Sequence, residues 1–384
     1  MANALAAIVG LGMIPCGKHL ERSVIDMATE AVYLAIKDAG IKPGQVDACF
    51  FGNVLAGRLF GANTIGQNVF WEVGINRVPV INVENACTSG STALYLAYNM
   101  IAAGQAEVVL AASSEKMYVK NAGLVDAGLD ELDTLLGLAA PATFGMRARR
   151  YMEEFGATEK QLALVAVKNR CHAQFNPLAQ FREPVTVEEV LASPMVADPL
   201  TRLQCCPIAD GAAAVVVCSP ALAKRLGRAV NIEATVLATG DYANPPNLAG
   251  FDTVRRAAHL AYEKAGIGPG DLHVVECHDA FTITEIMDYE ALGFCPVGQG
   301  GKLVEEGHTK LGGRLPVNVS GGLLSRGHPV GASGLLQAAE IITQLRGEAG
   351  ERQVRGAKLG LVQNMGGDKD GDIRACTISI LSTW

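Results

Sequence analysis

The sequence lacks the features of a nucleic-acid-binding, membrane-spanning or zinc-stabilised protein. Its 384 residues carry a net charge of −7 and contain no run of basic residues, so the electrostatic footprint of a nucleic-acid partner is missing. No segment reaches the ~18 apolar residues of a membrane span, and no basic signal segment precedes the first apolar stretch. The ten cysteines form no C-x-x-C pair and no Cys/His cluster with zinc spacing. We therefore expect a cytoplasmic chain with reduced thiols, no bound metal, no nucleic-acid partner and no membrane contact.

The composition favours a compact α/β enzyme. Hydrophobic residues make up 49% of the chain, charged residues 18%, and there are 43 glycines. Such a chain buries a large core and is not disordered. Its length allows two or three domains, or one large layered fold.

An internal repeat indicates how the chain is organised. Residues 31–47 (AVYLAIKDAGIKPGQVD) align with residues 257–273 (AAHLAYEKAGIGPGDLH). Each copy predicts an amphipathic helix, an A-G-I-x-P-G cap and turn, and then an apolar strand. The repeat predicts a duplicated α/β unit with mainly parallel sheets between helix layers.

Further paired segments extend the repeat over both halves. They are strands at 80–83 and 317–319, helices at 91–103 and 332–345, and closing strands at 212–218 and 375–381. We expect an N-terminal half at 1–225 and a C-terminal half at 226–384. The first half holds an insertion at about 115–205, with helices near 144–155 and 159–171. Insertions of that length are usually functional.

Cys87 is the first candidate for a catalytic residue. It lies in VENACTSGSTA (83–93), in a tight turn between an apolar strand and a helix rich in small residues. Unpaired N–H groups and the positive end of the helix dipole favour a thiolate there, and such settings lower a cysteine pKa to roughly 3.5–7.5. The alternative is a small buried core residue, which suits most of the other cysteines better.

Two histidines of the second half are candidates for proton transfer. His328 lies in GGLLSRGHPVGASG (321–334), a glycine-dense turn loosely equivalent to the Cys87 turn. A histidine pKa suits proton exchange with a thiol. His278 precedes Asp279 in ECHDAFTITE (276–285), just beyond a strand end, where α/β folds collect their site residues. The structural alternatives are an ordinary loop histidine and a helix-capping aspartate.

The last candidate is the strand end LVQNMGGD (361–368). Asn364 could offer an amide to a developing oxyanion, and Gly366 and Gly367 could offer backbone N–H groups. Taken by itself, this motif is more simply interpreted as a glycine turn.

Together and in this order, the motifs resemble those of the thiolase superfamily, and most closely its sterol-carrier-protein-type members. The resemblance covers essentially the whole chain. C-T-S-G at Cys87 and G-H-P-x-G-A-S-G at His328 are specific in this context, and residues 165–217 are similar to the corresponding stretch of those proteins almost throughout. The resemblance implies a five-layered α-β-α-β-α sandwich, a homodimer, and a coenzyme A thioester as substrate in a tunnel that ends at Cys87.

The resemblance also implies the chemistry, namely thiolysis of a β-ketoacyl-CoA by free CoA or the reverse Claisen condensation. Cys87 attacks the carbonyl and becomes acylated. His328 takes the thiol proton and later helps to hold the thioester oxygen. His278, with a water, stabilises the enolate oxygen of the second substrate. Backbone N–H groups of Cys87 and Gly366 match the second oxyanion hole.

The sequence departs from the family at the second catalytic cysteine. Many thiolases carry it in a C-x-G motif, where this chain has Asn364. Sterol-carrier-type members carry it in H-D-C-F, where this chain has Ala280. We hypothesise that His278 supplies the α-proton transfer, since strand alternation turns Cys277 away from it.

Partner and substrate are expectations from the same resemblance. Relatives with H-D-A-F often work with a small OB-fold/zinc-ribbon subunit, which predicts a hetero-oligomer. Tunnel width depends on residues around 124–144, and Leu132–Gly145 is compatible with a roomy apolar pocket. Acetoacetyl-CoA and a bulky aromatic thioester such as benzoylsuccinyl-CoA both stay open. The alternative functions are a ketoacyl-synthase-like decarboxylating condensation, a thiolase-fold retro-aldolase and a non-catalytic acyl-CoA- or lipid-binding scaffold.

Overall fold

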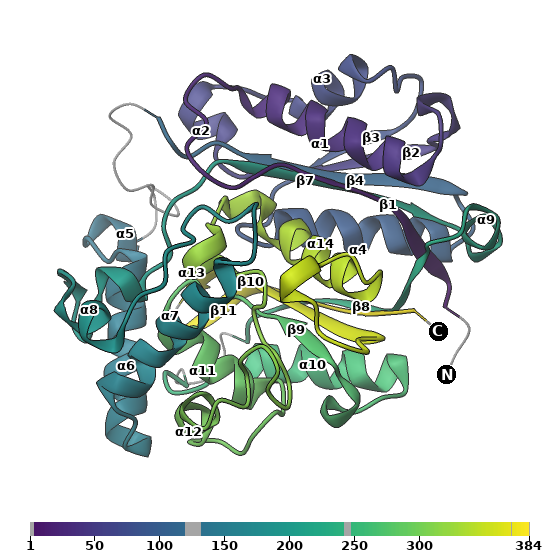
Figure 1. The fold of residues 1–384 in the computed structure, drawn as a ribbon. Coiled ribbons are helices and arrows are strands. Elements are labelled where there is room, and N and C mark those ends of the chain that lie inside the picture. The colour runs from purple at the N-terminus through teal and green to yellow at the C-terminus, as the bar shows by residue number, and fades with distance from the viewer. Residues whose placement is uncertain (1–3, 120–131, 242–246, 370, 384) are drawn as a thin grey trace.

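Helices and sheets alternate in five layers (Figure 1). The computed structural model describes residues 4–119, 132–241, 247–369 and 371–383. Helix α1 (Val24–Ala39) packs on the strands of the first half, and α10 (Asp252–Ala265) packs on those of the second. Between the two groups of strands lie α4 (Ser89–Ala102) and α14 (Ser333–Leu345), which contact each other. This arrangement confirms the predicted α-β-α-β-α sandwich.

In the described part of the chain, the main sheet has nine strands in the order β3-β2-β4-β7-β1-β8-β11-β10-β9. The strands are β1 (Ala6–Met13), β2 (Ala48–Gly52), β3 (Val80–Val83), β4 (Val108–Glu115), β7 (Gly211–Cys218), β8 (Val230–Thr239), β9 (Val274–Glu276), β10 (Leu359–Lys369) and β11 (Asp372–Ser382). Pairing of β1 with β8 joins the two groups of strands. The halves therefore share one continuous hydrogen-bonded sheet.

The expectation of mainly parallel sheets is wrong. Among the described strands of this sheet, β2–β3, β2–β4 and β9–β10 pair in parallel, and the other pairs are antiparallel. The reason is the way each half closes. Strand β7 enters antiparallel between β4 and β1, and β11 folds back on β10 as a hairpin, which needs no helical crossover.

The repeated helix and turn take the same backbone path in both halves. Helix α1 ends at Gly40 with φ 66°, and α10 ends at Gly266 with φ 67°. Glycine adopts this left-handed conformation without steric cost. Each cap leads through a proline-containing 3-10 turn into the next strand, β2 or β9. The same device therefore returns the chain to the sheet in both halves.

The second repeated pair matches less closely. Strand β3 spans Val80–Val83 as predicted. The stretch Val317–Val319 forms only a single bridge, from Val317 to Val275. Asn318 has φ 57°, a left-handed conformation that ends an extended strand. The predicted strand is therefore absent at this place in the second half.

The insertion and the outer loops add short elements around this frame. They are α2 (Ala56–Phe60), α3 (Ile65–Glu72), α5 (Leu132–Leu135), α6 (Ala140–Phe155), α7 (Glu159–Ala173), β5 (Met195–Ala197), β6 (Leu200–Thr201), α8 (Val187–Ala192), α9 (Pro220–Leu226), α11 (Thr282–Ala291), α12 (Gly300–Glu305) and α13 (Gly322–Arg326). Both predicted insertion helices are confirmed, as α6 and α7.

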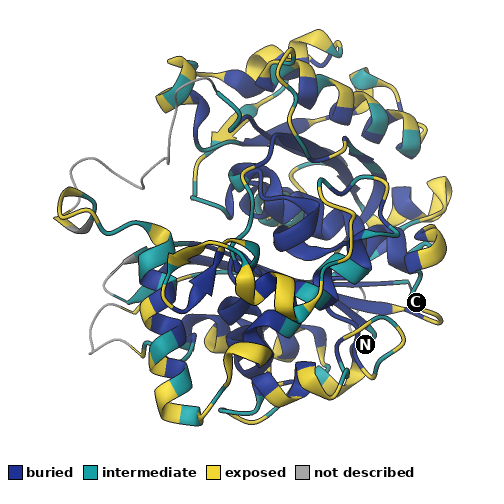
Figure 2. Cartoon of the chain, turned by 60° about the vertical axis from the view of Figure 1, so that its left-hand side comes forward, coloured by how far each residue is buried: buried dark blue, intermediate teal, exposed yellow. Residues whose placement is uncertain are grey.

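The middle helix layer brings the candidate turns together. Every residue of α14 is buried, as is the first turn of α4 (Figure 2). A Cβ at Gly334 would lie 2.6 Å from Cβ of Ser91, and one at Gly90 would lie 2.9 Å from the carbonyl oxygen of Gly331. Small residues therefore let the N-termini of α4 and α14 approach closely. The turns that precede these helices carry Cys87 and His328.

Candidate active site

Cys87, His278 and His328 form one cluster. The sulfur of Cys87 and one ring nitrogen of each histidine all lie within 4.8 Å of one another. The two imidazole rings meet edge to face, with centroids 5.1 Å apart. Cys87 is partly exposed, whereas both histidines are buried. The structure thus brings together the three side chains predicted from the sequence, one from the first half and two from the second.

The turn before α4 places Cys87 at the end of the helix. Ala86 has φ 47°, a strained conformation for a residue with a side chain. Hydrogen bonds within the turn hold it, because the N–H of Ser89 and its hydroxyl both donate to the Ala86 carbonyl. The N–H of Asn85 donates back to that hydroxyl. The tight turn predicted around Cys87 is therefore built by its own backbone and by Ser89.

The free site holds a neutral thiol and neutral imidazoles. Burial raises the pKa of Cys87 to about 12, against the lowering effect of a hydrogen bond from the Gly367 backbone. Burial, with the nearby Arg326, lowers the pKa of His328 to about 3. Burial and the neighbouring His328 also hold the pKa of His278 well below its usual value. The sequence-based expectation of a lowered cysteine pKa is wrong for this state, because loss of hydration outweighs the helix terminus.

The hydrogen bonds of His328 define its tautomer. Nδ1 lies 2.7 Å from the hydroxyl oxygen of Ser333. That hydroxyl donates its one hydrogen to the carbonyl of Pro329, at 3.0 Å. Nδ1 must therefore carry the ring proton and donate to Ser333. Nε2 keeps its lone pair, so His328 can accept a proton.

The β10–β11 hairpin approaches the Cys87 turn backbone to backbone. A Cβ at Gly366 would lie 2.7 Å from the backbone nitrogen of Cys87. Gly367, with φ 69°, supplies the backbone hydrogen bond to the thiol. Sequence analysis emphasised Gly366, and the G-G pair was the signal for its neighbour. Asn364, buried on the same strand, places Nδ2 2.8 Å from Nδ1 of His278.

Glu115 is a buried group near the site that sequence analysis missed. Its carboxylate accepts hydrogen bonds from the backbone N–H groups of Val54, Leu55 and Gly331, at 3.0–3.1 Å. Burial raises its pKa to about 7. Because Gly331 follows His328 closely, this carboxylate links the end of β4 to the turn that carries the histidine. The signal in the sequence was a charged residue at the end of an apolar strand.

Comparison with known families assigns the chain. The family model described as "Thiolase, N-terminal domain" matches residues 6–221. The model described as "Thiolase C-terminal domain-like" matches residues 234–380. The chain belongs to the thiolase family.

Three relatives refine this assignment. An acetyl-CoA acetyltransferase of Methanothermobacter thermautotrophicus is 41% identical, over 94% of this thiolase and 96% of the relative. Sterol carrier protein 2 of Homo sapiens is 41% identical, over 94% and 69%. The benzoylsuccinyl-CoA thiolase subunit BbsB of Thauera aromatica is 40% identical, over 90% of each chain. The predicted sterol-carrier-type group and the predicted acyltransferase function are confirmed.

A solved structure shares the fold over nearly the whole chain. The structure described as "Ltp2-ChsH2(DUF35) aldolase" superposes with a TM-score of 0.85 at 30% identity, over 98% of this thiolase and 97% of that chain. That protein represents the retro-aldolase alternative. The acetyl-CoA acetyltransferase and the benzoylsuccinyl-CoA thiolase subunit, at 41% and 40% identity, are more similar in sequence to this chain than the aldolase is, so the acyltransferase assignment stands.

The insertion packs against the site from the side of α6. Arg147, fully buried on this helix, donates to Asp368 at 2.9 Å and to the carbonyl of Gly371, both in the β10–β11 hairpin. Phe144 of the same helix stacks on Phe281, with ring centroids 4.6 Å apart. Phe281 belongs to the H-D-A-F motif that contains His278. Of the segment expected to set the tunnel width, residues 124–131 lie outside the described part.

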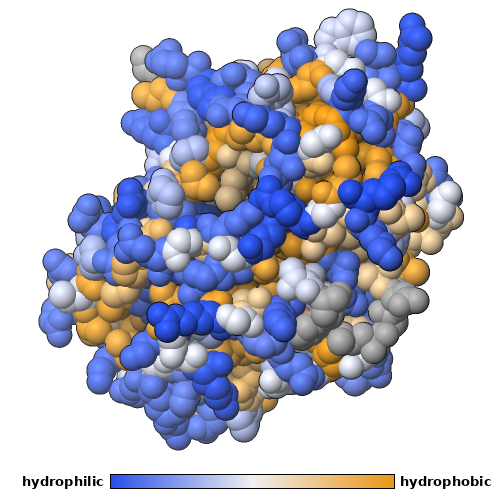
Figure 3. All heavy atoms as spheres, turned by 45° about the vertical axis from the view of Figure 1, so that its right-hand side comes forward, coloured by the Kyte–Doolittle hydropathy of each residue, from blue (hydrophilic) through white to orange (hydrophobic). Residues whose placement is uncertain are grey.

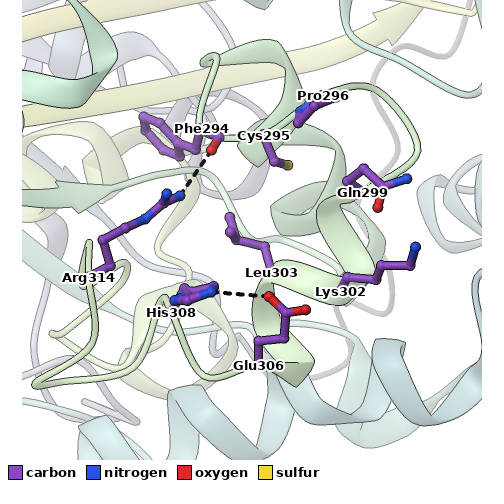
Figure 4. Close-up of a pocket in the computed structure, with 9 residues that line it drawn as sticks. All are labelled: Phe294, Cys295, Pro296, Gln299, Lys302, Leu303, Glu306, His308 and Arg314. Atoms are coloured by element: carbon purple, nitrogen blue, oxygen red, sulfur yellow. Dashed lines mark hydrogen bonds and ion pairs between the residues drawn. The ribbon is translucent and has the colours of Figure 1, made fainter.

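A pocket of about 540 Å³ lies away from this cluster, beside α12 (Figure 4). Its lining includes Cys295, and His308 there pairs with Glu306. None of its lining residues belongs to the Cys87 cluster. The pocket therefore supplies no group to the chemistry at Cys87.

None of the helices among the described residues combines the length and the apolar character that crossing a membrane requires.

Proposed function

We propose that this thiolase cleaves a β-ketoacyl-CoA with free CoA, or forms one in the reverse direction, through an acyl-enzyme on Cys87. The observation that carries this proposal is the cluster of one thiol and two imidazole nitrogens within 4.8 Å. A nucleophile with a base in reach is the arrangement that covalent catalysis requires.

In the first step, the Cys87 sulfur bonds to the keto carbon while its proton moves to Nε2 of His328. With a thiol pKa of about 12, the thiolate fraction at pH 7 is only about 10⁻⁵. The base must therefore act during the attack. The bond between the α and β carbons then breaks, and its electron pair leaves as the enolate of an acyl-CoA, which takes up the proton held by His328. Free CoA then attacks the acyl-Cys87 thioester, and its thiol proton passes through His328 to the departing Cys87 sulfur, which restores the thiol.

We assign the enolate oxygen to His278 and the thioester oxygen to the hairpin. The ring of His278 is buried against His328, so a hydrogen bond from it acts in a water-poor environment, where such bonds are strong. The backbone of Gly366 and Gly367 lies against Cys87. Replacing His278 with Ala should abolish α-proton exchange of the second thioester while acylation of Cys87 survives.

The proposed substrate is a β-ketoacyl-CoA with either a short or an aromatic acyl group. One relative is named as an acetyl-CoA acetyltransferase and another as a benzoylsuccinyl-CoA thiolase subunit. Phe281, three residues after His278 in the chain, stacks on Phe144, and an aryl group of the substrate would pack well against such rings. A panel of linear and aryl β-ketoacyl-CoA thioesters, assayed for thiolysis, decides between the two.

The test of the mechanism is to trap the acyl-enzyme. Wild-type protein incubated with a β-ketoacyl-CoA should gain the acyl mass on the peptide that contains Cys87. The Cys87→Ser variant should lose both the adduct and the thiolysis activity. Cys295→Ser, outside the cluster, is the matched control and should retain both. Carbon–carbon cleavage that persists in Cys87→Ser would support the retro-aldolase alternative and overturn the thiolase mechanism.

The proposed assembly contains two copies of this chain and a small OB-fold/zinc-ribbon subunit. Strand β3 ends the described sheet, and its Ile81 is 46% exposed, so a second copy could extend the sheet there. Hydrophobic atoms also gather on the upper, N-terminal half of the face in Figure 3. The relative BbsB is named as a subunit, and the aldolase structure names ChsH2(DUF35) beside Ltp2.

Two measurements test this assembly. Sedimentation should give a dimer that Ile81→Lys converts to a monomer, and a wild-type monomer would contradict the β3 interface. Co-expression with an OB-fold/zinc-ribbon subunit should yield a stable complex with raised affinity for acyl-CoA. Full activity and affinity of the purified chain alone would contradict the need for that subunit.

A further inference from the structure

Asn364 lies where the resemblance places the C-x-G cysteine of many thiolases, and its amide has a fixed orientation. The chain of hydrogen bonds starts at Gln337, whose Nε2 donates to the backbone carbonyl of Gln363 at 3.0 Å. A carbonyl can only accept, so Oε1 of Gln337 must face the other way. That oxygen lies 2.8 Å from Nδ2 of Asn364. Asn364 therefore presents its NH₂ group on this side, and its Oδ1 faces the hydroxyl of Ser91 at 3.1 Å.

The second hydrogen of this NH₂ group is directed at His278. Nδ2 of Asn364 lies 2.8 Å from Nδ1 of His278. Because Nδ2 has no lone pair to offer, Nδ1 must accept this hydrogen bond. A neutral imidazole has one lone pair in the ring plane, so its proton must be on Nε2. Asn364 and Gln337 are both fully buried, and reversing either amide would set oxygen against oxygen and cost both hydrogen bonds.

We propose that Asn364, oriented by Gln337, is a positioning residue that holds His278 as the Nε2–H tautomer and so makes it a hydrogen-bond donor. His328 has the opposite tautomer, because Ser333 takes its Nδ1–H. The two neighbouring imidazoles thus have different roles, with a lone pair on one and an N–H on the other. This assignment rests on the proposed function for its catalytic meaning. It favours oxygen stabilisation by His278 over the proton abstraction hypothesised from the sequence.

The same tautomer prevents the cluster from acting as a metal site. One sulfur and two imidazole nitrogens within 4.8 Å are a ligand set that Zn²⁺ commonly uses. A metal needs the lone pair of each imidazole, and the lone pair of His278 is already taken by Asn364. Cys87 and His328 are then left as two ligands, fewer than the three protein ligands of ordinary catalytic zinc sites. Asn364 thereby keeps the nucleophile free of metal.

The direct test is the tautomer in the wild-type protein. Nitrogen-15 NMR of histidine-labelled protein should show Nδ1 of His278 unprotonated and Nε2 protonated, and the reverse for His328. The His278→Asn and His328→Asn variants assign the signals by their disappearance. A protonated Nδ1 on His278 would overturn the proposal. This readout is independent of turnover, so it stays valid even if no acyl-enzyme forms and the proposed function fails.

A second test converts the donor into an acceptor. Asn364→Asp offers no N–H, so it should move the ring proton to Nδ1 and expose the Nε2 lone pair. We expect the affinity for Zn²⁺ or Co²⁺ to rise about tenfold, the reverse of the loss that follows when a ligating histidine is deprived of the acceptor that orients it. A thiolate-to-Co²⁺ absorption band should appear and should vanish in Asn364→Asp/Cys87→Ser. The hydroxyl of Thr377 contacts the Ser91 hydroxyl and the backbone carbonyl of Asn364. Thr377→Val is therefore the matched control, because it removes a neighbouring hydrogen bond and leaves the side-chain amide of Asn364 in place.

Kinetics separate the two roles of His278. In Asn364→Asp, acylation of Cys87 should continue, while α-proton exchange should fall about 10²-fold because an oxygen has lost its donor. Unchanged or faster exchange would show that His278 works as a base and overturn the donor assignment. If this variant does not fold, Gln337→Met removes the acceptor that orients Asn364, and its His278 should show a mixture of tautomers. Wild-type protein that binds Co²⁺ through Cys87 as tightly as the variants would also refute the proposal.

Discussion

The two helices of the middle layer begin in equivalent turns that carry opposite chemistry. The Cys87 turn of the first half is partly exposed and held by short-range backbone bonds. The His328 turn of the second half is buried, and residues distant in the chain hold it. One of them is Glu115, whose carboxylate accepts a hydrogen bond from the backbone N–H of Gly331. The thiol lies in a partly exposed turn, whereas the imidazole of His328 lies in a buried one, where its hydrogen bonds fix the tautomer. The two halves of the repeat thus differ at equivalent turns: the first half presents a partly exposed thiol, and the second half presents a buried imidazole with a fixed tautomer.

Of the substitutions that test this comparison, removal of the imidazole of His328 should reduce activity most. We expect His328→Ala to lower kcat/KM for thiolysis about 10³-fold, because the neutral thiol of Cys87 loses its proton acceptor. His308→Ala, which changes an imidazole paired with Glu306 outside the cluster, is the control and should stay near wild type. A loss of less than tenfold for His328→Ala would assign the base to another group.

Moving the β10–β11 hairpin away from the Cys87 turn should reduce the rate by a smaller factor. In Gly366→Ala the new methyl group would lie 2.7 Å from the Cys87 nitrogen, so the hairpin must move away from the nucleophile. We expect kcat to fall about 10²-fold, the usual effect of losing an oxyanion donor. Gly17→Ala, with open space at its Cβ position, should keep its rate. An active Gly366→Ala enzyme would show that the hairpin backbone takes no part.

The protonation state of the first turn can be tested by alkylation. Burial raises the Cys87 pKa to about 12. Below that pH, the thiolate fraction should therefore increase about tenfold for each unit by which the pH is raised. Iodoacetamide labelling of Cys87, followed by mass spectrometry, should therefore accelerate from pH 6 to pH 10 without a plateau. A plateau near pH 7 would indicate a thiolate already present in the free enzyme.

The outer helices, in contrast, should respond equally in the two halves. Gly40→Ala and Gly266→Ala should each lower the free energy of unfolding by about 1 kcal/mol, because alanine is strained in the left-handed conformation that both caps adopt. Denaturant melts measure this loss, and thiolysis should stay at wild-type rates in both variants. A much larger cost in one half would show that the repeat is not equivalent there.

The sequence predicted best what depends on local pattern. The cap and turn at Gly40 recur at Gly266 because both copies of the A-G-I-x-P-G segment place a glycine at the left-handed position that ends the helix. Cys87, His278 and His328 were predicted to meet, since motif order and resemblance carry that information, and the structure places them together. The division of the chain at residue 225 and the individual catalytic roles stay predictions.

What sequence analysis missed depends on tertiary packing. The raised pKa of Cys87 comes from burial by segments far away in the chain, which outweighs the local helix terminus. The pairing of β7 with both β1 and β4 is a long-range choice. The amide chain through Gln337 and Asn364 joins a helix to a strand across the middle layer. No short motif encodes such contacts.

The buried guanidinium of Arg147 joins the insertion to the hairpin that lies against Cys87. It fastens the insertion helix to the hairpin through Asp368 and Gly371. Anyone who grafts the insertion of another thiolase onto this frame must therefore transplant the hairpin tip with it. A graft of the insertion without the hairpin tip would leave this guanidinium buried without its carboxylate partner, which is strongly destabilising.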